Sequence, residues 1–131
     1  MRTRFALPAL CAALMMLTGT AGAQLHDPAT PPAVAAKIAL RGEANGIAVR
    51  EMRILRKNDI LTVQADLSNT GRSDRTMFYR FSWLDSIGSP VGDGESWKQI
   101  SVLGLGRQTV KSVAPTSAAI DLRLEMNVQP R

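Results

Sequence analysis

The sequence predicts an all-β fold, an immunoglobulin-like antiparallel β-sandwich of six to seven short strands. Three observations support this fold class. Apolar and polar residues alternate in several short segments, turn-forming residues separate those segments, and no segment shows the period of a long helix. The 131 residues are enough for one such domain. A small open barrel is the competing architecture.

The first element is an export signal over residues 1–23. Arg2 and Arg4 make the start positive, Phe5 to Leu17 is apolar, and the segment ends in Ala21-Gly22-Ala23. This order is typical of a secretory signal that is cleaved between Ala23 and Gln24. The apolar stretch is shorter than the roughly 20 residues of a membrane-spanning helix. We therefore expect a periplasmic protein with no membrane span.

Cys11 lies inside this signal. A lipid-anchored protein would need a small residue before the cysteine, whereas Leu10 stands there. We therefore expect no lipid anchor. Cys11 is the only cysteine, so the exported domain would have no disulfide and would depend on its core alone.

Residues 24–45 follow as a Pro- and Ala-rich tether. Pro28, Pro31 and Pro32 withhold backbone donors from any β-ladder, and the segment shows no regular period. We expect it to be flexible, with the sandwich domain spanning residues 46–131.

The first strand of that domain begins at Ile47 and contains a slip in its alternation. Ile47 and Val49 set one phase, and Met52 and Ile54 continue with the phase shifted by one residue. An extra residue inserted against the partner strand produces such a slip, so the pattern predicts a β-bulge. Lys57-Asn58-Asp59 then predicts a hairpin turn.

The next strand has the clearest alternation in the chain. Its apolar residues share one face, which predicts a sheet with one face buried and the other in water. These residues are Leu61, Val63, Ala65 and Leu67. A turn over residues 69–74 ends the strand.

An aromatic strand follows over residues 76–85. Tyr79, Phe81 and Trp83 alternate on one face together with Met77, which predicts core positions. The opposite face carries Phe78, Arg80 and Leu84, which we consider a possible partner contact because adjacent apolar residues on a wet face suggest a patch.

The remaining strands are shorter. Residues 97–103 and 108–113 surround Gly104-Leu105-Gly106. The last strand alternates apolar residues with Asp121, Arg123 and Glu125. Its apolar positions are Ile120, Leu122, Leu124 and Met126.

The segment Tyr79-Arg80-Phe81-Ser82-Trp83-Leu84-Asp85-Ser86-Ile87-Gly88 resembles the Y-R-F-x-W-x-D-x-x-G signature of the YcfL family. This family consists of small predicted periplasmic lipoproteins of unknown function from Gram-negative bacteria. The resemblance covers roughly residues 46–126 and includes the strand that runs into Asn69-Thr70-Gly71. It implies a β-sandwich and an envelope location, and it implies no reaction. The present chain departs from the family in lacking an acceptable lipidation site around Cys11.

The residue types of common active sites are absent from the expected domain. The only histidine, His26, lies in the tether, and a lone histidine there supports neither a catalytic triad nor a zinc site. Asp85, Asp93 and Glu95 surround a Gly-rich loop, where they are solvated turn carboxylates or, as an alternative, ligands of a calcium ion. Their spacing fits no known calcium loop. We expect no enzyme, no cofactor and no bound metal.

These observations predict a non-catalytic binding or accessory module, whose partner is a cell-envelope protein. The alternative is a carbohydrate- or peptidoglycan-binding module that uses Trp97 and Arg107. Exposure of Trp97 beside polar side chains would favour this alternative. Loss of Arg2 and Arg4 leaves 14 basic and 11 acidic residues, a net charge of +3. The basic residues form no stripe with aromatic residues, so we expect no nucleic-acid partner.

Overall fold

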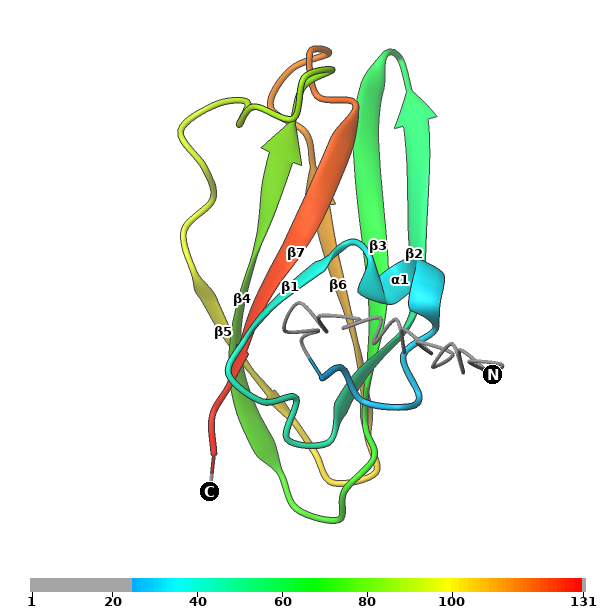
Figure 1. Cartoon of the computed structure of the whole chain (residues 1–131), viewed down its shortest axis with the longest axis vertical. Coiled ribbons are helices and arrows are strands. Elements are labelled where there is room, and N and C mark those ends of the chain that lie inside the picture. Colours follow the sequence, from blue (N-terminus) through cyan, green and yellow to red (C-terminus); the bar gives the residue numbers. More distant parts are fainter. Residues whose placement is uncertain (1–24, 131) are drawn as a thin grey trace, which may run out of the picture.

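The computed structural model describes residues 25–130, which form a sandwich of two β-sheets. One sheet has four strands in the order β1-β7-β4-β5, and the other has three in the order β2-β3-β6 (Figure 1). The expected fold class is confirmed. The elements are α1 (Pro32–Ala35), β1 (Ile38–Arg41), β2 (Ile47–Lys57), β3 (Ile60–Asn69), β4 (Arg75–Leu84), β5 (Lys98–Val102), β6 (Arg107–Val113) and β7 (Asp121–Val128).

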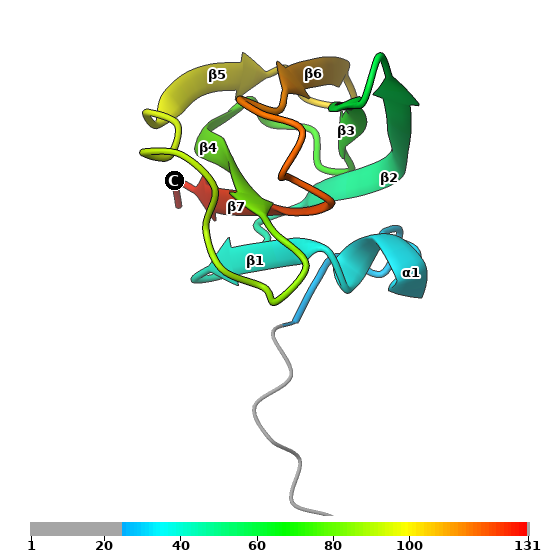
Figure 2. The same ribbon diagram turned by 90° about the horizontal axis from the view of Figure 1, so that it is seen from above.

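The core lies between the two sheets and is built by the alternating positions of the central strands. Figure 2 shows the sandwich from above, with the turn between β5 and β6 carrying the chain from one sheet to the other. β4 buries Met77, Tyr79, Phe81 and Trp83, as its alternation predicts. β3 buries Leu61, Val63, Ala65 and Leu67 in the same way. The apolar face of each strand thus points to the opposite sheet.

β2 contains the predicted bulge. Its register against β3 shifts between Val49 and Glu51, where the alternation of the sequence slips. The hairpin that follows turns through Asn58 and Asp59, whose φ angles are 50° and 63°. Both residues tolerate this left-handed conformation, which two-residue hairpins require.

The start of the domain differs from the expected boundary at residue 46. β1 lies within the expected tether, yet Ile38 and Leu40 are buried in the core. β1 pairs in parallel with β7, with Ile38 opposite Leu124, so the sandwich is not wholly antiparallel. Thr30, which precedes β1, is also held in the fold: its Oγ1 accepts a hydrogen bond of 3.0 Å from the backbone N–H of Val49. Residues from Thr30 onward are therefore part of the fold.

The last strand begins one residue later than the alternation predicts. Ile120 precedes β7 and is 52% exposed, whereas Leu122, Leu124 and Met126 are buried. The backbone N–H of Ile120 donates to the carbonyl of Leu84 at 2.8 Å, which joins the two strand ends. The export signal lies outside the described residues. Within residues 25–130, no helix has the length and apolar character needed to cross a bilayer.

Candidate functional site

The outer face of the four-stranded sheet carries aromatic and polar side chains in neighbouring rows. Phe78 of β4 lies opposite Asn127 of β7, and Asn127 lies opposite Arg41 of β1. Arg80, two residues further along β4, lies opposite Glu125. Side chains alternate between the faces of a strand, so these residues face away from the core.

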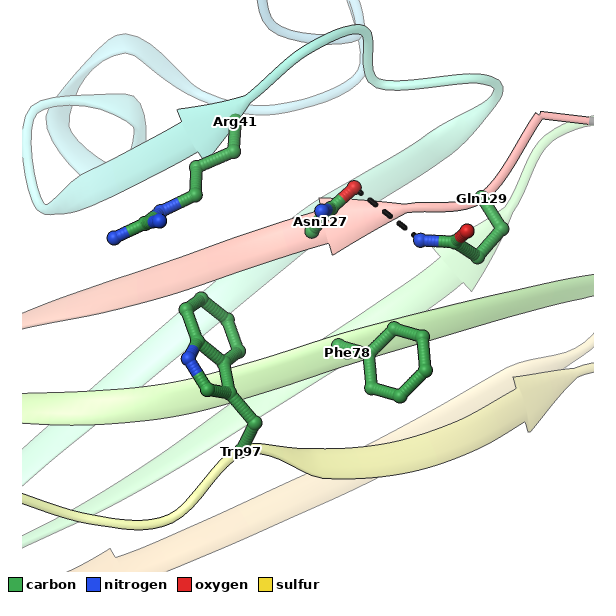
Figure 3. Close-up of a pocket in the computed structure, with 5 residues that line it drawn as sticks. All are labelled: Arg41, Phe78, Trp97, Asn127 and Gln129. Carbon is green, nitrogen blue, oxygen red and sulfur yellow. Dashed lines mark hydrogen bonds between the residues drawn. The ribbon is translucent and has the colours of Figure 1, made fainter.

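A groove of about 390 Å³ lies on this face (Figure 3). We call it the Trp97 groove, after the residue just before β5, and it is lined by Arg41, Phe78, Trp97, Asn127 and Gln129. Phe78 and Trp97 are half-buried and supply apolar surface. Nε2 of Gln129 donates a long hydrogen bond of 3.4 Å to Oδ1 of Asn127. The groove thus combines two aromatic rings, two amides and one guanidinium.

Two arginines fix the indole of Trp97. The guanidinium carbon of Arg80 lies 4.5 Å from the centroid of the indole, and that of Arg41 lies 5.1 Å from it. Such distances are those of cation–π attraction, which adds to the packing of the ring. The ring therefore has a defined position although it lies outside the core.

Glu125 holds both arginines in place. Nε of Arg80 donates to Oε2 of Glu125, and Nη2 of Arg41 lies 3.4 Å from Oε1 of the same carboxylate. The hydrogen bond from Arg80 is the largest cause that lowers the pKa of Glu125 below its usual value. Glu125 is therefore ionised at neutral pH. The side chain of Arg41 is 58% exposed, and besides its place over Trp97 it makes only this long contact among residues 25–130.

The carboxylates of the Gly-rich loop stabilise turns and backbone. Oδ1 of Asp85 accepts the N–H groups of Ile87 and Ser89 at 3.0 and 2.9 Å. Oε2 of Glu95 accepts the N–H of Phe81 at 2.8 Å, and its Oε1 accepts the hydroxyl of Ser112 in the opposite sheet. Among residues 25–130, no three His, Cys, Asp or Glu side chains gather closely enough to hold a metal ion.

The structure brings together some of the predicted site residues and separates others. Phe78 and Arg80 lie side by side with Trp97. Leu84 lies on the same face but six residues further along β4, about 20 Å from Phe78 at the rise of a β-strand. Arg107 lies on β6 of the other sheet, opposite Ser68. The structure therefore does not bring Phe78 together with Leu84, or Trp97 together with Arg107, in one contiguous patch.

Arg41, Glu125, Asn127 and Gln129 are site residues that the sequence interpretation missed. The alternation of the last strand places Glu125 and Asn127 on its outer face, so the pattern contained a signal for these two. Arg41 carries no such signal, because the sequence pattern places its segment in the tether.

Comparison with known proteins places the chain in a family and supports the fold. The family described as "Protein of unknown function (DUF1425)" matches residues 35–128. No curated protein matches the chain. The crystal structure of Campylobacter jejuni cj0090 is similar, with a TM-score of 0.60 and 19% identity, over 71% of this chain and 98% of that chain.

A second similar crystal structure is that of a DUF1425 family member from Shewanella sp. pv-4. It has a TM-score of 0.54 and 23% identity, over 65% of this chain and 78% of that chain. At these identities, both structures inform on the fold alone. The family match covers most of the chain and includes β1, which lies in the expected tether. The chain therefore belongs to the DUF1425 family.

Proposed function

We propose that the protein is a non-catalytic binding module of the bacterial cell envelope that holds another envelope protein at the Trp97 groove. The main support is the groove itself. In it, Phe78 and the fixed Trp97 lie beside the amides of Asn127 and Gln129 and the guanidinium of Arg41. Rigid aromatic side chains supply contact area at a low cost in conformational entropy. The side chains of Asn127 and Gln129 offer donors and acceptors for a peptide backbone.

The arginines favour a protein partner over a sugar. A sugar ring would stack on the face of an exposed aromatic ring, whereas the indole of Trp97 already attracts the guanidinium groups of Arg41 and Arg80. The proposed glycan residue Arg107 also lies in the other sheet. A peptide that contacts the edge of Trp97 and the ring of Phe78 would leave both arginines in place.

A carbohydrate- or peptidoglycan-binding module is the second candidate. Trp97 lies beside the polar side chains of Asn127 and Gln129, as this alternative expects, but it is half-buried where the alternative expects an exposed ring. In this case Arg41 would have to move from the ring to admit a sugar.

We propose that the protein is located in the periplasm, with its export signal cleaved between Ala23 and Gln24 and without a lipid on Cys11. The three-part pattern of residues 1–23 supports it. We also propose kinship with the YcfL proteins, from the signature between Tyr79 and Gly88. The intact mass of the exported protein tests this location and the cleavage site. A mass that includes residues 1–23, or an acyl chain, would contradict it.

Photo-crosslinking in living cells tests the proposed partner. A photoreactive amino acid replaces Phe78 in the groove, and a matched position, the exposed Lys111 of β6, carries it in a control chain. The proposal predicts a crosslinked protein from position 78 that is absent from position 111. Crosslinks of equal strength at both positions would contradict it. Retention on purified cell-wall sacculi that Trp97→Ala abolishes, with no protein crosslink at position 78, would favour the glycan module.

A further inference from the structure

Two exposed leucines project from one end of the sandwich. Leu103 and Leu105 lie in the turn between β5 and β6 and are 63% and 68% exposed. This turn meets the β3–β4 loop at the lower end of the molecule in Figure 1. We call Leu103 to Gly106 the leucine tip. It is separate from the Trp97 groove, since no residue lines both.

The leucine tip is held rigidly by the neighbouring β3–β4 loop. The N–H of Gly104 donates to Oδ1 of Asp74 at 2.9 Å, and that of Leu105 donates to the carbonyl of Gly71 at 2.8 Å. Nδ2 of the buried Asn69 bridges both loops, donating to the carbonyls of Ser73 and Val102. A Cβ atom on Gly104 would lie 2.1 Å from the carbonyl oxygen of Arg72, so only glycine fits there. The two leucines are therefore presented on a fixed backbone.

This presentation is costly to the folded protein. Leu105 has a φ of +58°, a left-handed conformation that is unfavourable for a leucine and favourable for a glycine. Its side chain also leaves most of its apolar surface in water. Strained residues of this kind persist where the surrounding structure holds them in place, and they cluster at functional sites.

The charges around the leucine tip indicate the kind of partner. Arg72 and Arg107 are exposed and Arg75 is half-buried, and none of the three has an ion-pair partner among residues 25–130. The carboxylates in the adjoining loops are Asp74, which accepts the N–H of Gly104, and Asp27, which accepts the hydroxyl of Thr70. Three arginines without an ion-pair contact of their own therefore belong to the segments next to the two leucines: Arg72 in the β3–β4 loop, Arg75 opposite Val102, and Arg107 directly after Gly106, where it also attracts Asp66.

We propose that the leucine tip inserts into the surface of an anionic lipid bilayer. A projecting apolar tip fits the soft boundary between headgroups and acyl chains, where leucines lose contact with water. Arginines at the base of the tip lie at the level of the lipid phosphates, which attract them. Contact at this end would leave the Trp97 groove on the side of the sandwich free for its partner.

Sedimentation with vesicles tests the proposal. The exported protein is mixed with phosphatidylcholine vesicles that contain phosphatidylglycerol, and with vesicles of phosphatidylcholine alone. We expect binding to the anionic vesicles that decreases with added salt. Leu105→Ser should weaken it about tenfold or more, from the transfer free energy of one leucine. The matched control is Leu55→Ser near the end of β2, opposite Thr62 of β3, which is 67% exposed and should bind as the unchanged protein does.

A second variant separates this role from a structural one. Leu105→Gly relieves the positive φ, so we expect an equal or higher melting temperature together with weakened binding to the anionic vesicles. A leucine with only a structural role would give a lower melting temperature and unchanged binding. The proposal is overturned if neither vesicle binds, or if Leu55→Ser weakens binding as much as Leu105→Ser. It is also overturned if Leu105→Gly abolishes self-association in sedimentation while vesicle binding persists, because the tip would then contact a second copy.

Discussion

Replacement of Phe81 by alanine should remove a large share of the stability of the domain. Phe81 is fully buried at the centre of β4. Its ring centroid lies 6.2 Å from that of Tyr79, in an edge-to-face arrangement, and 6.5 Å from that of Trp83. Truncation of a buried phenylalanine costs about 3–5 kcal/mol, from lost burial and the cavity that remains. A small domain is stable by only about 5–15 kcal/mol, so Phe81→Ala should remove a large share of that stability.

The matched control is Phe78→Ala, the same substitution three residues earlier on the same strand. Phe78 is half-buried on the outer face, so its loss should cost about 1 kcal/mol, in the range of ordinary substitutions. Urea denaturation followed by far-UV circular dichroism gives both free energies of unfolding. An equal effect of the two substitutions, or a cost below about 1 kcal/mol for Phe81→Ala, would refute the assignment of the strand faces.

Three further predictions follow from the polar contacts. The pKa of Glu125 is lowered in the folded state, so its stabilising contribution is present above the ordinary pKa of 4.5 and is lost as the pH falls through the folded value. Urea midpoints between neutral and acidic pH should show this loss, and Glu125→Gln should reduce it. Arg80→Ala should free the indole of Trp97, seen as increased quenching of tryptophan fluorescence by acrylamide, and unchanged quenching would contradict the cation–π contact. Asp85→Ala removes the acceptor of two turn N–H groups and should cost about 1–2 kcal/mol, whereas Asp93→Ala, without such contacts among the described residues, should cost little in the same denaturation assay.

Local alternation accounts for most of what the sequence predicts correctly. The slip after Val49 indicates the bulge because one extra residue changes the phase of every later side chain. The aromatic strand is equally clear, since its large residues recur at every second position. These signals lie within one strand and need no knowledge of its neighbours.

Pairing between distant segments explains what the sequence does not predict. β1 has only four residues, follows a Pro-rich stretch and pairs with β7 some 80 residues later, so no local pattern indicates it. Without β1, the sequence does not predict the position of Arg41, which contacts both Glu125 and Trp97. Leu84 shares a face with Phe78, but a shared face does not imply contact along an extended strand.

The central claim is that the Trp97 groove binds the envelope partner, and partner capture with groove variants tests it most directly. The unchanged protein and its variants are immobilised, and each is used to capture the partner that crosslinking at position 78 identifies. Folding of each variant is checked by circular dichroism. We predict that the double variant Phe78→Ser, Trp97→Ser folds and loses capture. Leu84→Ser, on the same face but outside the groove, should keep it. Undiminished capture by the folded double variant, or equal loss with Leu84→Ser, would contradict the claim.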